Sequence, residues 1–345
     1  MKNLNRLPLA QRRFVFITIL IGGLLIIGAI TLILITGSLN SGRSLPVALV
    51  PEVRVGVLAE LPDSDSFPAA VAVAADGMVY TGSFASGAVW AIQPTGDVVE
   101  IAGARALIGA VSALEPLSDG TLLIVDAGDT DPRTSGGALW RLTLNGDLTN
   151  AGEPADGEGF IAPNDITLDA QGNFYVSDSG RNQILRFRLP EDGAAPTGEV
   201  WWSPPAPPEG IASAIVGLAH DAPNDAIIAT DPETNTIYRI SVEDGSTTVI
   251  FQHPEGGATP PGFDGAVVLP DGTLYVAALG QNGIARVDIE NNALDYIAGL
   301  FRGSSDVAYD AANNRLIVPN FDQSGLVLPL TSPSLPFTID YVAFN

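Results

Sequence analysis

The sequence contains no cysteine, and it contains no lysine after Lys2. Without cysteine there are no disulfides, no thiolate nucleophile and no cysteine-ligated metal. Without lysine, the rest of the chain also lacks a Schiff-base or amine nucleophile. Imidazole is limited to His220 and His253. The chemistry open to this chain therefore depends mainly on its carboxylates.

Positive charge is also scarce in the main part of the chain. After residue 36 there are 12 arginines and 39 acidic residues, which gives a formal charge of −27. Such a surface repels phosphate backbones, so a nucleic acid is excluded as a partner. We interpret the acidity as a source of solubility rather than as a dedicated cation-binding surface.

One long apolar run interrupts this pattern near the N-terminus. Residues 14–36 carry no charge, and about 20 apolar residues suffice to cross a bilayer as a helix. A cleavable signal peptide usually has a shorter apolar region and a small-x-small site, which is not found after residue 36. Four basic residues precede the run, namely Lys2, Arg6, Arg12 and Arg13. This predicts a single-pass anchor in the cell membrane with its N-terminus in the cytoplasm and the remainder outside.

The sequence therefore divides into four parts. We expect a cytoplasmic N-terminus at residues 1–13, the transmembrane anchor at 14–36, a Gly/Ser/Pro tether at 37–52 and one large domain at 53–345.

The large domain is repetitive. Short apolar strands follow a two-residue turn six times, at intervals of 42–53 residues, and each is followed by a further apolar strand. Gly, Asn and Asp suit such turns because they tolerate positive φ. The turns are Asp76-Gly77, Asp119-Gly120, Gln171-Gly172, Asn224-Asp225, Asp271-Gly272 and Asn313-Asn314. Four short antiparallel strands per repeat predict an all-β fold, a six-bladed β-propeller behind one transmembrane helix.

The closure of the sixth blade is left open by the sequence. Its third strand is expected in SGLVLP, from Ser324. Its outer strand has two candidates, residues 54–61 upstream of the first blade and the C-terminal residues 337–344.

Residues that repeat in the third strands are interpreted as scaffold. Trp90, Trp140 and Tyr238 occupy one position, where an aromatic ring packs between blades. Arginines recur just after that position, and we expect them to brace neighbouring blades. They are Arg141, Arg186, Arg239 and Arg286.

Propellers bind ligands at the mouth of the central channel, where each innermost strand starts. Aligning the repeats on their turns places one residue of each blade at this mouth. This set, the mouth ring, comprises Ala69, Ser112, Asn164, Val216, Asp264 and Ser305. Asp264 is its only acid. We expect Asn164, Ser112 and Ser305 to contact a ligand there.

Two segments resemble known repeats. Residues 163–184 (PNDITLDAQGNFYVSDSGRNQI) look like an NHL repeat, and residues 263–277 (FDGAVVLPDGTLYVA) resemble the regucalcin/gluconolactonase family. Members of that family are six-bladed propellers that hold one divalent cation and open lactones or related esters. The resemblance implies a metal and general-base role for Asp264 and a substrate- or metal-side role for Asn164. The other two ligand positions of the family fall at Val216 and near Ala69 or Ala70, which cannot bind a metal.

Two functions follow from these residues. The first is an extracytoplasmic binding module that recognises a small molecule, a glycan or a protein at the channel mouth. The alternative is a divalent-metal-dependent lactonase or esterase, with a cation such as Ca²⁺ held by Asp264 and Asn164. Fold alone does not decide between them.

Three further sites are interpreted as structural. His220 lies in a first strand, where a satisfied core histidine is expected, and His253 lies in a Pro-rich surface loop. Asp126, Asp129 and Asp131 do not have the spacing of an EF-hand loop, so solvent exposure is expected for them.

Overall fold

The computed structural model describes residues 45–131, 136–188, 195–207, 209–254, 256–328 and 331–345. Almost all of them belong to one compact unit, Ser44–Gln323 with Leu335–Asn345. The segment Ser324–Ser334 is grouped separately and contains a short helix, α2 (Ser324–Val327).

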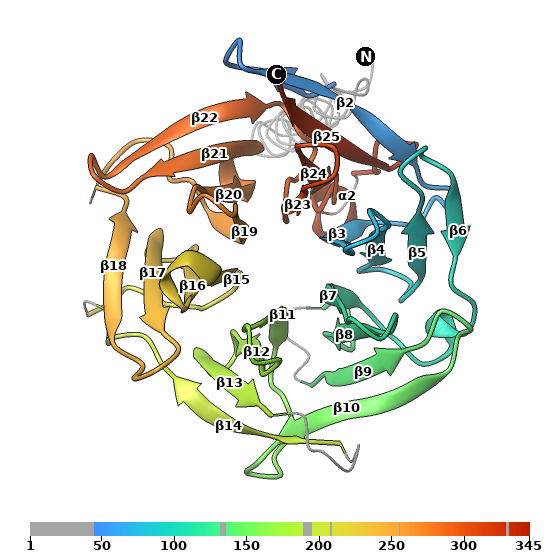
Figure 1. Ribbon diagram of the computed structural model, residues 1–345, viewed down its shortest axis with the longest axis horizontal. Coiled ribbons are helices and arrows are strands. Elements are labelled where there is room, and N and C mark those ends of the chain that lie inside the picture. The colour runs from blue at the N-terminus through green and yellow to red at the C-terminus, as the bar shows by residue number, and fades with distance from the viewer. Residues whose placement is uncertain (1–44, 132–135, 189–194, 208, 255, 329–330) are drawn as a thin grey trace, which may run out of the picture. The chain divides into compact units, whose positions relative to one another are not determined.

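Six groups of four antiparallel strands form the large unit and surround a central channel (Figure 1). Within a blade, consecutive strands pair from the channel outwards. Blade one comprises β3 (Pro68–Val73), β4 (Val79–Ser83), β5 (Val89–Ile92) and β6 (Val98–Glu100). Blade two comprises β7 (Val111–Pro116), β8 (Leu122–Asp126), β9 (Ala138–Leu142) and β10 (Leu148–Pro154). Blade three comprises β11 (Pro163–Leu168), β12 (Phe174–Asp178), β13 (Gln183–Phe187) and β14 (Thr197–Trp202).

The remaining blades follow the same order. Blade four comprises β15 (Leu218–Asp221), β16 (Ala226–Asp231), β17 (Thr236–Ser241) and β18 (Thr247–Gln252). Blade five comprises β19 (Phe263–Val268), β20 (Leu274–Ala278), β21 (Gly283–Asp288) and β22 (Ala293–Gly299). Blade six comprises β23 (Ala308–Asp310), β24 (Arg315–Pro319), β25 (Thr338–Phe344) and β2 (Val53–Glu60). Short 3₁₀ turns occur at η2 (Ala104–Ala106), η3 (Ala222–Asn224) and η4 (Leu279–Gln281).

The predicted turns are confirmed in all six blades. The second residue of each turn has a positive φ, from 86° at Gly77 to 45° at Asp225. The aspartate of three Asp-Gly turns also accepts a backbone N–H two residues on, as Asp76 does from Met78 at 3.0 Å. These local preferences explain why the repeat can be recognised in the sequence.

Both ends of the large domain close blade six. The outer strand is β2, as the first candidate predicted, and it pairs with β25 from Val53–Phe344 to Glu60–Thr338. The C-terminal candidate is present too, but as the third strand, because β25 pairs with β24. The prediction of a third strand from Ser324 is wrong, since Ser324–Val327 is helical. The chain passes this segment before it returns to the sheet.

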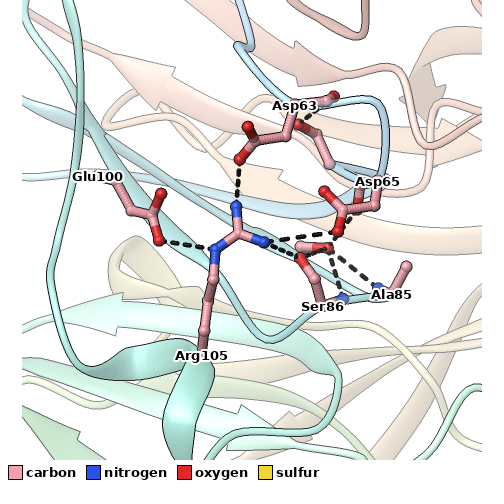
Figure 2. A network of polar contacts seen from close by, with 8 residues as sticks. Asp63, Asp65, Ala85, Ser86, Glu100 and Arg105 are labelled. Atoms are coloured by element: carbon pink, nitrogen blue, oxygen red, sulfur yellow. Dashed lines mark hydrogen bonds and ion pairs between the residues drawn. The ribbon is translucent and has the colours of Figure 1, made fainter.

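An arginine fastens the closing strand to blade one. The Arg105 guanidinium, in η2, forms an ion pair with Asp63 and lies 3.5 Å from an Asp65 carboxylate oxygen. Both aspartates follow β2. The Nε of Arg105 donates a hydrogen bond to Glu100 of β6 at 2.7 Å (Figure 2). The same guanidinium lies over the ring of Trp90. This cluster links blade six to blade one at the point where the ring closes.

The outer edges of the sheets carry two additions. Strand β10 pairs in parallel with β14, which joins blades two and three into one eight-stranded sheet. The predicted tether, residues 37–52, is described from residue 45, and its β1 (Val47–Ala48) pairs with β22. The predicted transmembrane segment 14–36 lies outside the described residues. In the described part of the chain, no helix has the length and apolar character needed to cross a membrane.

The repeated aromatic residues pack as predicted. Trp90 is fully buried, Tyr238 is nearly so, and Trp140 packs against the core between blades one and two. The expectation that the repeated arginines brace neighbouring blades is wrong, because each pairs with an acid of its own blade. The pairs are Arg141 with Asp119, Arg186 with Glu199, Arg239 with Asp221 and Arg286 with Asp295. These arginines reach the fourth strand, as in blades three and five, or the end of the first strand and the turn after it, as in blades four and two.

Candidate functional site

The two serines of the mouth ring hold neighbouring blades together. The Ser305 hydroxyl is buried and donates to the Ala69 carbonyl of blade one at 2.7 Å. The Ser112 hydroxyl lies 3.4 Å from the Pro163 carbonyl of blade three. Hydroxyls of second strands do the same elsewhere, as when Ser177 donates to the Val216 carbonyl at 2.6 Å.

Asn164 and Asp264 are the polar mouth-ring residues that the blades leave available. Both are half-buried, and neither side chain has a hydrogen-bond partner among the described residues. Val216 and Ala69 add no donor atom to them. No group of three or more His, Asp or Glu side chains in the described ranges is arranged to hold a metal ion. A hard divalent cation needs six to eight oxygens, so the residues at this mouth do not fit the metal site of the resembled family.

A second acidic level lies one residue further along the innermost strands. The register of β11 against β12 shifts between Pro163 and Ile166, which marks a β-bulge. Asp165 sits in this bulge and accepts the N–H of Ile166 at 2.7 Å and that of Leu218, in blade four, at 2.6 Å. Its carboxylate therefore bridges two blades.

Asp306 repeats this arrangement in blade six. It accepts the N–H of Val307 at 2.7 Å and that of Val71, in blade one, at 2.8 Å. A Cβ on Gly265 of blade five would lie 2.1 Å from an Asp306 carboxylate oxygen, so only glycine allows this approach. Strand β11, which carries Asp165, and strand β23, which follows Asp306, lie on opposite sides of the channel (Figure 1).

These aspartates line a cavity of about 300 Å³ within the channel. All six innermost strands contribute to its wall. Its acids are Glu115, Asp165 and Asp306, and its other titratable groups are His220 and Tyr309. Of the residues that the structure describes, no arginine and no mouth-ring residue lines it. We call this space the channel cavity.

Burial and mutual repulsion make these acids reluctant to ionise. Burial, with the nearby Asp306 charge, raises the pKa of Glu115 to about 8. Burial raises the pKa of Asp306 to about 6, although its two backbone N–H donors act in the opposite direction. The pKa of Asp165 is raised well above its usual value by burial and by Asp306, and that of Asp264 by burial and by both aspartates. Glu115, Asp165, Asp264 and Asp306, the channel carboxylates, thus act on one another across the channel.

Three of these four acids were not predicted from the sequence. Alignment on the turns selects Asn164 and Ser305, which immediately precede Asp165 and Asp306. The signal was present, because Asp165 and Asp306 occupy equivalent positions in opposite blades and Glu115 lies two positions further along in blade two. A β-bulge changes the side-chain direction after the mouth ring, and the turn alignment could not reveal it.

The remaining candidates are mostly structural. Asp126 was expected to be exposed, which is wrong. It is buried and accepts N–H groups of Gly109, Ala110 and Gly128 as well as the indole N–H of Trp140. Asp129 is exposed and accepts the N–H of Asp131.

Both histidines line cavities. His220 lies in β15 at the channel cavity, and His253 lines a separate pocket of about 950 Å³ between the loops that flank blade four. The Nε2 atom of each is buried and has no hydrogen-bond partner among the described residues. The expectation of a satisfied core histidine at 220 is therefore wrong for this atom.

The fold and the site define an all-β propeller with an acidic channel, and comparisons with known proteins agree with the propeller fold. The NHL repeat family matches residues 160–187. No curated protein sequence is significantly similar to this chain. The predicted resemblance to regucalcin/gluconolactonase-like and NHL-repeat propellers is confirmed, at the level of the fold.

Three solved structures illustrate this likeness. A gluconolactonase from Xanthomonas campestris is 16% identical, with a TM-score of 0.62 over 88% of this chain and 96% of that one. The calcium-binding protein regucalcin from Agrobacterium tumefaciens is 17% identical, with a TM-score of 0.59 over 84% and 94%. An inactive variant of virginiamycin B lyase from Staphylococcus aureus, crystallised with quinupristin, is 18% identical, with a TM-score of 0.57 over 85% and 100%.

Proposed function

We propose that this protein is a membrane-anchored, extracytoplasmic β-propeller that binds a ligand in its channel and performs no chemistry on it. The observation that carries the proposal is the contrast between the two levels of the channel. The mouth ring offers Asp264 and Asn164 without a third ligand among the described residues. Below it, the channel cavity of about 300 Å³ is walled by all six blades, a size at the lower end of ligand pockets.

The arrangement of Asp264 also favours binding over catalysis. A general base needs a pKa near the working pH and a partner that positions it. Burial raises the pKa of Asp264, which suits a base, but no described side chain orients its carboxylate. The alternative, a metal-dependent lactonase, is supported by the fold shared with a gluconolactonase and by the place of Asp264 at the channel mouth.

Hydrolysis assays on the full-length protein separate the two functions. We expect no turnover of gluconolactone or 4-nitrophenyl acetate above the buffer rate, with or without 1 mM-scale CaCl₂, and no bound divalent metal after gel filtration. The near-isosteric Asp264→Asn variant is the control. Calcium-dependent hydrolysis that this variant loses would establish the lactonase and refute the binding module.

The anchoring rests on the uncharged residues 14–36 and the four basic residues before them. Protease added to intact cells is expected to remove the propeller and leave the N-terminus protected. Digestion that occurs only after lysis would place the propeller in the cytoplasm and overturn this part of the proposal.

A further inference from the structure

The carboxylates of Asp165 and Asp306 both accept backbone N–H groups from two blades. Asp165 accepts two backbone N–H groups and Asp306 accepts two, one on each oxygen. These donors favour the ionised form of each aspartate, whereas burial opposes it. A cation in the channel would stabilise the charged carboxylates and leave their backbone hydrogen bonds in place.

Among the described residues, no arginine or lysine side chain in the channel wall pairs with these carboxylates. The residues that line the channel cavity include three acids and no arginine, and the sequence has no lysine after Lys2. Glu115 also lines the cavity, and its carboxylate has no hydrogen-bond partner among the described residues. A buried charge without a partner is costly, so a cation in the cavity would relieve the repulsion among all of these acids.

The layout of the acids determines which kind of cation fits. They are spread around the cavity wall, and the described residues contain no three-ligand metal group. A hard metal ion such as Ca²⁺ requires oxygen ligands that converge on it, with metal–oxygen distances of about 2.3–2.6 Å. Strands β7 and β11, which carry Glu115 and Asp165, are neighbours in the ring, whereas β23, which follows Asp306, lies across the channel from β11 (Figure 1).

The wall between the acids is aliphatic. It includes Val71, Leu114, Ile166, Leu218, Ala266 and Val307. Methylene groups would lose their contact with water against such a surface, which is favourable. One molecule of liquid water takes up about 30 Å³. The cavity volume of about 300 Å³ is therefore far larger than the volume of one bare ion.

We propose that the channel cavity binds a small aliphatic diammonium ion, whose two ammonium groups are shared among the carboxylates of Glu115, Asp165 and Asp306. This inference rests on the proposed binding function and specifies its ligand class. Each ammonium group donates to carboxylate oxygens, and the methylene chain spans the aliphatic wall.

Binding of such an ion depends on pH because its acids must be ionised. The groups that face the cavity are Glu115 from β7, Asp165 from β11, His220 from β15, and Asp306 and Tyr309 from blade six. Asp264, in the mouth ring, interacts electrostatically with Asp306 and Asp165. Burial and the charge of Asp306 raise the pKa of Glu115 to about 8, so this group ionises only in mildly alkaline solution. Affinity is therefore expected to rise with pH up to about pH 8, by up to tenfold per pH unit, roughly.

The test uses the full-length protein in mild detergent, 1,4-diaminobutane as the probe and 1,4-butanediol as the uncharged probe of equal length. At pH 8.5 and constant ionic strength, the diamine is expected to raise the Tm in a concentration-dependent way and the diol is not. Glu115→Gln is expected to weaken this response at least about tenfold, the equivalent of one lost charge pair. Glu158→Gln, at an exposed glutamate outside the channel, is expected to respond as the wild type does.

Several results would overturn the inference. These are no response to the diamine, an equal response to the diol, a response to CaCl₂ alone, or an undiminished response in Glu115→Gln. The pH profile gives a second readout, because a diamine affinity that is constant from pH 6 to pH 9 contradicts the role of Glu115. Failure here without lactone hydrolysis would leave the binding module intact, whereas hydrolysis that Asp264→Asn abolishes would refute the proposed function itself.

Discussion

Replacing Glu115 by glutamine should stabilise the protein at alkaline pH. Burial and the charge of Asp306 raise the pKa of Glu115 from 4.5 to about 8. A group with a raised pKa in the folded state favours folding below its unfolded pKa, and this contribution is lost as the pH rises through the folded value. The wild type should therefore lose stability between about pH 5 and pH 9, with the steepest change below pH 8.

The size of this effect follows from the same change in pKa. A tenfold difference in proton affinity is worth about 1.4 kcal/mol, so ionised Glu115 costs up to about 5 kcal/mol at pH 9. Asp306, with a pKa raised to about 6, adds a loss of the same sign between about pH 4 and pH 6. Against a typical total stability of about 5–15 kcal/mol, these losses are large.

Glutamine preserves the shape of Glu115 and cannot ionise. At pH 5 the Glu115→Gln variant is expected to match the wild type within about 1 kcal/mol, and at pH 9 to exceed it by several kcal/mol. Urea unfolding of the full-length protein, followed by tryptophan fluorescence at a series of pH values without amines, measures both. Glu158→Gln is the control and should follow the wild type. A wild-type stability that is flat from pH 6 to pH 9, or a variant that retains the wild-type slope, would refute the reasoning.

Three further predictions concern the contacts that hold the ring. Gly265→Ala places a Cβ 2.1 Å from an Asp306 carboxylate oxygen and 2.8 Å from the Cα of Asp306. It should lower the free energy of unfolding in urea by about 1–3 kcal/mol or more, and an unchanged midpoint would contradict the close approach. Arg105→Met removes the ion pairs of the closure and should lower the free energy of unfolding by about 1–2 kcal/mol, and by less in high salt. Arg188→Met, at an exposed arginine, should lower it by almost nothing, and equal losses in the two variants would show that the cluster is unimportant. A chain ending at Ser334 lacks β25, the strand that pairs with both β24 and β2. This truncated protein should not unfold cooperatively, and a native-like transition in calorimetry would exclude this closure.

The sequence determined the features that depend on neighbouring residues. Asp-Gly and Asn-Asn turns require a positive φ at their second residue, and all six predicted turns have it, with strands on either side. The aromatic position of Trp90 and Tyr238 was also predictable, because a large apolar side chain at a repeated strand position is buried wherever blades pack.

Pairing between distant segments was decided by the tertiary structure. The strand expected from Ser324 is helical, and β25 takes its place between β24 and β2. The apolar run after Ser324 resembles the third strands of the other blades in composition. What it lacks is a position beside a partner strand, and that position is a property of the closed ring.

The candidate site divides in the same way. Sequence periodicity located the innermost strands and the acid Asp264 at their start. It did not locate the channel cavity, because a β-bulge shifts the register by one residue and turns Asp165 into the channel rather than Asn164. The meeting of Asp165 with Asp306 spans more than one hundred residues and depends on the closure of six blades. Only a folded ring brings these charges near each other, because electrostatic repulsion and burial act through space and not along the chain.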